Sequence, residues 1–511
     1  MRRILVVALV GVAFLTGLPA AATVDDALYA DEVTIVGAGG PMEFNGRRYG
    51  GTFSVRVVGD RVVLTERVDP DAYMRGIREV PASWEPAALR AQAIAARTYL
   101  AWRLDRGRST SGQRYGYDIC ATAACQVYRG GVGEPGAAEW DAAVAATAGE
   151  ILLHDGAPAQ AMYSSTTSGR TRNFEDVFGG TPKPYLVSVP SPNEPSPYVR
   201  WTIDVTQAEM RAILREAGIS AELLNLRVET TADGNGPWIV EGVFTDGLRS
   251  WTSWQFRSLM NRHADDALPD DFPALRPDGR RYPTTILGPT YTVVRGLRYD
   301  AAVATGPPLV GVYSFVGGGW GHDVGMSQFG AQAMALEGSS HEEILAHYYS
   351  DLVPSQAGRF LPSQLVVGLS FTSDPVEVGG TLAVSIDGAP IADGVEGSWR
   401  FESTGAQVRI IPPVAFGVAP SLSEAATEVT STAPLVVVAK PEGGGQVRLV
   451  VFEGGTPVFR TAWENWFGGT IVFAPPGLRG GEGVRVAVER REEVDGPTTV
   501  VPVTPGFIRW G

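Results

Sequence analysis

The 511-residue chain has little cysteine, little histidine and a deficit of positive charge. It contains 2 Cys and 5 His, and its 42 Lys and Arg stand against 56 Asp and Glu, which gives a formal net charge of −14 at pH 7. A chain of this charge repels phosphate backbones, so nucleic acid is excluded as a partner on electrostatic grounds. Simple electrostatic attraction to an anionic envelope polymer is excluded in the same way.

The N-terminus also lacks an apolar run long enough to cross a membrane. Residues 4–18 are apolar, but a spanning helix requires roughly 20 such residues. Arg2 and Arg3 precede the run, and three alanines end at Ala22. This pattern is typical of an export signal over residues 1–22. We therefore expect a protein that is secreted or held in the cell envelope after cleavage near Ala22.

The two cysteines form the one available pair. Cys120 and Cys125 have C-x4-C spacing, and export leads to an oxidising compartment. A disulfide is therefore expected between Cys120 and Cys125, with two buried free thiols as the alternative.

The length of the chain predicts two or three domains, because 511 residues are too many to fold around one hydrophobic core. Residues 52–58 and 61–68 alternate around Gly59-Asp60, as in a hairpin. The chain then mixes helical and strand-like stretches, which predicts an α+β region. The predicted helices are 86–103, 137–147 and 206–217, and the predicted strands include 150–153 and 238–244. Residues 262–290, rich in Asp, Pro and Arg, form a possible insertion or loop.

From residue 363 to 511 the pattern changes to short strand-like runs separated by Gly and Pro turns. We expect an all-β, sandwich-like C-terminal module there, possibly two small domains. Trp463 and Trp466 suggest a sugar-stacking platform, although core aromatic residues are the commoner explanation.

One carboxylate stands out in the segment Tyr73-Met-Arg-Gly-Ile-Arg-Glu79-Val-Pro-Ala-Ser-Trp84. Glu79 has apolar neighbours on a loop ahead of a helix, where desolvation favours a protonated carboxyl group near neutral pH. Such a group is suited to act as a general acid. The following helix carries a stripe of small and apolar residues, from Leu89 to Leu100.

A second segment far along the chain reads Gly317-Gly-Gly-Trp-Gly-His322-Asp323-Val-Gly-Met-Ser-Gln328. Its glycines allow sharp turns and close approach to another segment or to a ligand. His322 and Gln328 then stand at the start of a helix from Ser327 to Glu337, and Ser340 with Glu343 has the spacing of a capping box for a further helix. A linker with a helix-cap histidine is the alternative.

Together these segments resemble the SpoIID/LytB family of peptidoglycan-cleaving enzymes. Further matches lie in the segments 121–130, 143–149, 161–171 and 177–186, in family order. The resemblance covers about residues 30–352. It implies a lytic transglycosylase that cuts the link between N-acetylmuramic acid and N-acetylglucosamine in peptidoglycan glycan strands, with the muramic C6 hydroxyl as nucleophile. One carboxylate then suffices, whereas an ordinary glycosidase uses two.

The resemblance also implies the roles of individual residues. Glu79 matches the catalytic acid/base, and no cofactor is implied. Substrate-binding positions are implied by the matches at Arg97, Thr98, Ser165, Ser168, Thr171, His322 and Gln328. A cell-wall amidase is a possible partner.

Two features depart from the family pattern. Asp323 replaces the usual glycine, so either the turn avoids positive φ or Asp tolerates it. Some relatives hold zinc near the Cys-Gln-Val-Tyr segment, but here only Cys120 and Cys125 are present without a nearby histidine, so we predict no metal.

Two other functions remain open from the sequence. The Asp323 departure favours a non-catalytic wall-binding or scaffold protein on the same fold. A hydrolytic muramidase is the other, and it requires a second carboxylate, for which the candidates are Asp118, Glu134, Asp141 and Asp176.

Overall fold

A computed structural model describes residues 28–132, 137–231, 234, 236–299 and 309–411, residue 413, and the strands between 427 and 506. The expected signal peptide, Glu134 and Trp463 lie outside these residues. Within the described part of the chain, no helix combines the length and apolar character needed to cross a membrane.

The first sheet is built on the predicted hairpin. β5 (Thr52–Val58) and β6 (Arg61–Val68) pair antiparallel, with Val58 opposite Arg61 across the Gly59-Asp60 turn. β2 (Glu32–Gly37) pairs with the other edge of β5. β1 (Leu28–Ala30), β3 (Met42–Phe44) and β4 (Arg47–Tyr49) complete the N-terminal strands.

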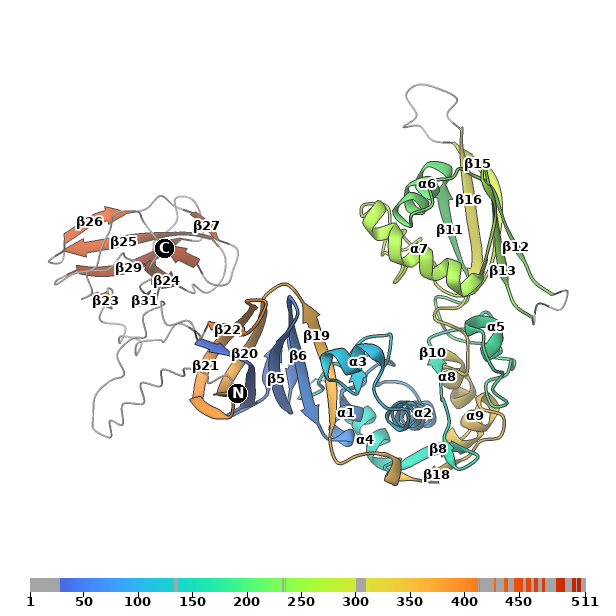
Figure 1. The fold of residues 1–511 in the computed structure, drawn as a ribbon, viewed down its shortest axis with the longest axis horizontal. Helices are drawn as coiled ribbons and strands as arrows, with labels where there is room; N and C mark the ends of the chain where they lie inside the picture. Colours follow the sequence, from blue (N-terminus) through green and yellow to red (C-terminus); the bar gives the residue numbers. More distant parts are fainter. Residues whose placement is uncertain are drawn as a thin grey trace.

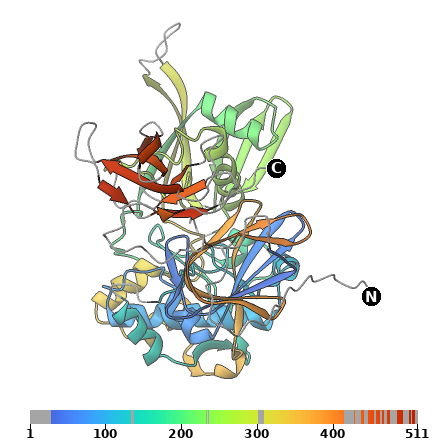
Figure 2. The same ribbon diagram turned by 90° about the vertical axis from the view of Figure 1, so that its left-hand side faces the viewer.

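Four later strands enter this same sheet. β19 (Leu365–Thr372) pairs with β6, and β20 (Val376–Ile386) pairs with β2. β21 (Ala389–Ser403) and β22 (Val408–Ile411) extend it as far as β1. The boundary predicted at residue 363 is therefore wrong, because residues 365–411 complete the N-terminal sheet. Figure 2 shows these orange strands beside the blue ones.

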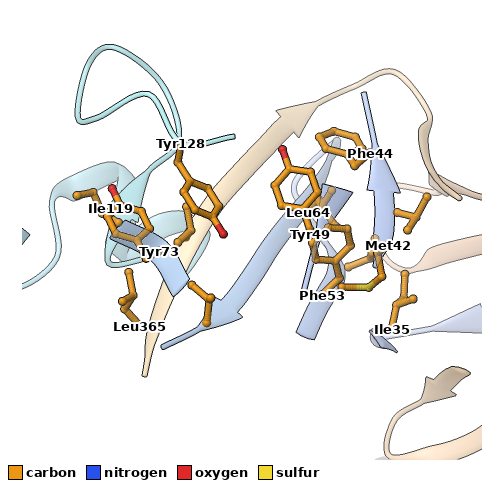
Figure 3. Packing of buried hydrophobic residues seen from close by; sticks show 14 of the residues in the cluster. Ile35, Met42, Phe44, Tyr49, Phe53, Leu64, Tyr73, Ile119, Tyr128 and Leu365 are labelled. Atoms are coloured by element: carbon orange, nitrogen blue, oxygen red, sulfur yellow. The ribbon is translucent and has the colours of Figure 1, made fainter. Parts of the chain in front are cut away.

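The core of this sheet continues onto two helices. Figure 3 shows Tyr73 of α1 (Pro70–Gly76) beside Tyr128, with Leu365 of β19 and Ile119 nearby. α2 (Pro86–Asp105) places Leu89, Ala93, Ala96 and Leu100 in this core, which confirms the predicted stripe.

α2 also packs against a second core on its other side. Ala91, Ile94 and Ala95 lie there with α8 (Gln328–Leu336) and α9 (His341–Tyr348). Ser340 and Glu343 form the predicted capping box of α9. α2 is thus buried between two layers, because alanines leave room for close packing on both sides.

Short elements connect these layers around α2. They are α3 (Thr110–Tyr115), β7 (Ile119–Cys120), α4 (Ala138–Ala146), β8 (Glu150–His154), β9 (Ala157–Pro158), β10 (Tyr163–Ser164), α5 (Phe174–Phe178), β17 (Met326–Ser327), β18 (Pro354–Gln356) and a 3₁₀ helix (Gly358–Phe360).

Residues 201–318 form a unit with its own core, which we call the insert; in Figure 1 it is the green and yellow part of the chain. It consists of β11 (Trp201–Thr206), α6 (Gln207–Glu216), β12 (Leu223–Glu229), β13 (Ile239–Phe244), β14 (Gly247–Thr252), α7 (Ser253–Ala267), β15 (Thr290–Tyr299) and β16 (Leu309–Gly318). The possible insertion or loop at 262–290 is only part of this unit. Its first residues belong to α7, and Phe272 and Ile286 are buried in the core.

The strands after residue 426 form two antiparallel groups. β23 (Thr427–Glu428), β25 (Gly445–Glu453), β26 (Thr456–Arg460), β27 (Glu464–Trp466), β29 (Val484–Arg491) and β30 (Thr499–Val501) form one sheet, and β24 (Val436–Ala439), β28 (Ile471–Phe473) and β31 (Val503–Gly506) form the other. The described chain is therefore mixed helix and sheet up to residue 411 and consists of strands beyond it. The proposed Trp463 and Trp466 platform falls outside the described side chains.

Candidate functional site

Glu79 lies on the loop between α1 and α2, partly buried, with both carboxylate oxygens occupied. The backbone N–H of Val127 donates to Glu79 Oε1 at 2.8 Å, and the Tyr163 hydroxyl donates to Oε2. Val127 follows the disulfide-closed loop, and Tyr163 belongs to β10. Three segments far apart in the sequence thus converge on this carboxylate.

A buried glutamine fixes the direction of the Tyr163 hydrogen bond. Gln126 Nε2 donates to the Ala96 carbonyl and to the Tyr163 hydroxyl, each at 3.0 Å, and Gln126 Oε1 accepts from the Tyr73 hydroxyl at 3.1 Å. A carbonyl only accepts, so the amide has one orientation. Tyr163 accepts from Gln126, and its own proton therefore points to Glu79.

The pKa of Glu79 is raised above its ordinary value. Desolvation by burial is the largest cause, and it outweighs the hydrogen bonds from Tyr163 and Val127 and the charge of Arg129, which lower the pKa. The carboxyl group therefore keeps its proton to higher pH than an exposed glutamate. At the same time, two donors are placed to stabilise the carboxylate form.

The second sequence motif lies against the first. β10 pairs with β17 in parallel, with Tyr163 opposite Met326 and Ser164 opposite Ser327. α8 then contacts the loop that follows Glu79: the ring of Phe329 lies 4.9 Å from Trp84, and Gln332 accepts a hydrogen bond from the Glu85 N–H at 3.0 Å. The structure thus joins the Glu79 loop and the glycine-rich block through Tyr163 and α8.

His322 is neutral in this arrangement. Burial, with a contribution from the Arg257 charge, lowers the pKa of His322 to about 4. Its Nδ1 accepts from the Val324 N–H at 3.1 Å, so the ring proton is on Nε2. Phe178 and Trp254 pack against the ring. His322 is suited to hydrogen bonding at the site and not to carrying charge.

Asp323 adopts φ of 61°, which settles the departure from glycine: the turn keeps its left-handed conformation, and Asp tolerates it. The side chain is buried and Thr290 donates to its Oδ2 at 3.1 Å, while Oδ1 has no partner. Burial raises the pKa of Asp323 far above its ordinary value. The turn that carries His322 therefore keeps a left-handed conformation although Asp323 stands in the place of glycine.

Arg97 and Thr98 do not reach a substrate. Both side chains are completely buried. The Arg97 guanidinium donates to the carbonyls of Thr147 at 2.6 Å and Val144 at 3.0 Å, at the end of α4. The Thr98 hydroxyl donates to Ile94 and accepts from the Leu152 N–H. The structure contradicts their predicted substrate-binding role, because both side chains lie in the interior: the Arg97 Nη atoms donate to the end of α4, and the Thr98 hydroxyl accepts from β8.

The four remaining predicted positions differ in exposure. Thr171 is fully buried and bonds to the backbone of Val189, so it stabilises its loop and does not line a groove. Ser165 is partly exposed near the start of α8, and its carbonyl accepts from the Phe329 N–H. Ser168 is exposed and lines a pocket. Gln328 is the first residue of α8 and is mostly buried.

Cys120 and Cys125 form the predicted disulfide. The bridge closes the turn directly ahead of Gln126 and Val127, the two residues that orient Tyr163 and bind Glu79. No group of three or more His, Cys, Asp or Glu side chains in the described ranges is arranged to hold a metal ion.

Two of the candidate second carboxylates, Asp118 and Asp176, have other partners. Asp118 accepts from Arg108 and from the Val366 N–H, each at 2.8 Å, and Asp176 accepts from Asn173. Asp141 has one buried oxygen without a partner, and the groups that shift the pKa of Glu79 include none of these carboxylates.

Two residues of the site, Tyr163 and Gln126, were not among the positions predicted from the sequence. Tyr163 and Gln126 both lie in segments that matched the family, but neither has an obvious chemical role when read alone. Only the fold brings their side chains to Glu79.

Comparison with known proteins supports the resemblance. Residues 59–154 match the family model described as "SpoIID: Stage II sporulation protein". The chain is 29% identical over 308 residues to the stage II sporulation protein D of Bacillus subtilis, covering 58% of this chain and 77% of that protein. It is 28% identical over 310 residues to the protein of the same name in Bacillus amyloliquefaciens, covering 58% and 77%.

A third relative is the amidase enhancer of Bacillus subtilis, 26% identical over 294 residues, which cover 53% of this chain and 38% of the relative. The matched region thus spans well under half of the amidase enhancer. Residues 59–154 are thus similar to the SpoIID family model, and the named relatives are consistent with the SpoIID/LytB family. This is a family of proteins related to sporulation and the cell wall.

Proposed function

We propose that this protein is a peptidoglycan lytic transglycosylase in which Glu79 is the general acid and base. The observation that carries the proposal is the position of Glu79: a carboxyl group with a raised pKa, both of whose oxygens face donors that stabilise the anion. The family domain supports the substrate class, glycan strands of peptidoglycan.

In the proposed reaction, protonated Glu79 donates its proton to the glycosidic oxygen as the bond from muramic C1 to that oxygen breaks. The muramic C6 oxygen then bonds to C1, and the Glu79 carboxylate accepts the C6 hydroxyl proton. The products are a 1,6-anhydro end and a new hydroxyl end, so no water is consumed. Positioned proton transfer of this kind contributes about 10² to 10⁴ in rate.

The test is digestion of purified glycan strands by the wild type and by Glu79→Gln. The amide keeps the shape of the side chain but cannot release a proton, so we expect turnover to fall by about 10² to 10⁴. Glu85→Gln is the matched control, since Glu85 is exposed six residues further along the same loop. Anhydro ends formed by Glu79→Gln at the wild-type rate would refute the assignment.

The amidase enhancer relative favours a second candidate, a wall-binding scaffold that assists a cell-wall amidase. Mass spectrometry of the digested strands separates the candidates: anhydro ends indicate the transglycosylase, reducing ends a hydrolytic muramidase, and uncut but bound strands a scaffold. An amidase partner is compatible with anhydro ends and also with uncut but bound strands.

Export belongs to the same proposal, because the substrate lies outside the membrane. The N-terminal pattern of residues 1–22 supports a signal peptide. N-terminal sequencing of protein recovered from culture medium or envelope tests cleavage near Ala22.

A further inference from the structure

A pocket of about 390 Å³ lies where the insert joins the rest of the chain. Ser168 and Glu194 line it from one side, and Thr290 of β15 and Val316 of β16 line it from the insert. Arg200, just before β11, and Trp238, just before β13, also line the pocket. We call this the junction pocket. Its volume lies within the range of small-molecule sites.

The Glu194 carboxyl group in the pocket wall already has hydrogen-bond partners within the protein. The Glu194 carboxyl group accepts from the N–H and hydroxyl of Thr167 at 2.9 and 2.6 Å, and from the Ser191 hydroxyl at 2.6 Å. Burial raises the pKa of Glu194 despite these donors. This residue therefore shapes the pocket and is not a free anion for a cationic ligand.

Arg200 is the cation of the junction pocket. It is exposed, and it makes no hydrogen bond or ion pair with any residue that the structure describes. A guanidinium presents a planar fork of donors that matches a carboxylate. The charge that faces an incoming ligand is thus positive, on a protein whose net charge is −14.

Trp238 is a fixed aromatic surface in the same pocket. Arg172 lies over its ring at 5.6 Å, and Arg172 is itself held by the carbonyls of Gly234, at 2.7 Å, and Gly236. Ser168 and Thr290 also line the pocket, and the Thr290 hydroxyl donates to Asp323. An aromatic surface beside polar residues suits a sugar ring, which is apolar on its faces and polar at its edge.

We propose that the junction pocket binds an acidic sugar, whose ring stacks on Trp238 and whose carboxylate pairs with Arg200. This inference rests on the proposed function, because a muramic residue with a free lactyl carboxylate is the acidic sugar of a peptidoglycan strand. Ser168 lies five residues after Tyr163, a reach of at most roughly 18 Å along the chain. The Cα atom of Ser168 therefore lies within roughly 18 Å of the Cα atom of Tyr163, the residue whose hydroxyl donates to Glu79.

The experiment measures binding of free N-acetylmuramic acid and free N-acetylglucosamine by ligand-observed NMR, with full-length Glu79→Gln protein so that no turnover intervenes. We expect the muramic acid to bind about tenfold more tightly, because it alone carries a carboxylate. Arg200→Gln is expected to remove this preference, and Trp238→Ala to weaken both sugars. Arg262→Gln, a change to an exposed arginine of α7 outside the pocket, is the matched control.

Equal affinity for the two sugars, or a preference that survives Arg200→Gln, would overturn the inference. Tighter binding of the dipeptide D-alanyl-D-alanine than of either sugar would also overturn it, since the pocket would then recognise a peptide carboxylate. The proposed activity stands or falls separately: strands cut to anhydro ends without muramic acid preference refute the pocket alone, and preference without cleavage refutes the activity alone.

Discussion

At the scale of single residues, Tyr163 supplies the side-chain hydrogen bond to Glu79. Its hydroxyl proton points to Glu79 because Gln126 occupies its acceptor side. The charged group that acts on Glu79 is Arg129. The nearby Tyr73 and Tyr99 have raised pKa values and stay neutral. The Tyr163 hydroxyl therefore opposes the desolvation that raises the pKa of Glu79, and this opposition can be removed by one substitution.

In Tyr163→Phe, we expect the pKa of Glu79 to rise, so the limb of the pH-rate profile on which activity falls with deprotonation moves to higher pH. The maximal rate should drop about tenfold or more, because the anion loses a charge-assisted hydrogen bond. Tyr349→Phe is the control, since its buried hydroxyl bonds to the Met162 carbonyl at 2.8 Å and not to Glu79. An unshifted pH profile in Tyr163→Phe would contradict the arrangement described.

Glu66 is another buried carboxyl group, outside the proposed chemistry. It accepts from the Gly51 N–H at 2.9 Å and from the Tyr128 hydroxyl at 2.8 Å, yet burial raises its pKa from 4.5 to about 7. The folded state therefore binds this proton more tightly than the unfolded state. The free energy of unfolding should fall as pH rises from about 4.5 to about 7, by about 3 kcal/mol, and stay level above that.

Glu66→Gln should abolish this pH dependence. We expect its melting temperature to match the wild type near pH 4.5 and to exceed it near pH 8, because the amide has no proton to lose. Thermal denaturation at the two pH values gives the answer, with the exposed Glu43→Gln as control. A variant that melts at the same difference from wild type at both pH values would show that Glu66 does not titrate in this range.

At the scale of elements, Arg97 binds α2 to α4. It donates to the last carbonyls of α4, where a cation also complements the helix dipole. Arg97 therefore has a structural role, whereas the family resemblance implied that it binds substrate. The distinction has measurable consequences for stability and for catalysis.

Arg97→Lys keeps the charge but loses the fork that reaches both carbonyls. We expect a loss of about 2 kcal/mol, or roughly 4 to 8 °C in melting temperature, with kcat/KM of the folded protein unchanged. The exposed Arg90→Lys on the same helix serves as control. A lower kcat/KM at unchanged stability would restore the substrate-binding role.

At the scale of the whole molecule, the late strands β19 to β22 complete a sheet begun by the N-terminal strands. A chain truncated after residue 413 keeps this sheet whole, whereas one truncated after residue 362 exposes the edges of β2 and β6. We expect the first to be soluble and active and the second to aggregate, because unpaired edges seek other strands. Soluble, active protein ending at 362 would contradict this organisation.

The sequence by itself determined the local elements and the proposed acid, Glu79. The β5–β6 hairpin, the cap of α9, the α2 stripe and the Cys120–Cys125 bridge follow from short-range patterns, because turn chemistry, capping and periodicity depend on neighbours in the chain. Glu79 was found in the same way, from its apolar surroundings.

Only the tertiary structure decided which side chains meet. It buried Arg97, Thr98 and Thr171, brought Tyr163 and Gln126 to Glu79, and joined residues 365–411 to the first sheet. The physical reason is that burial and hydrogen-bond partners arise from segments distant in sequence. A polar residue on a helix reads the same whether its partner is a sugar or a backbone carbonyl.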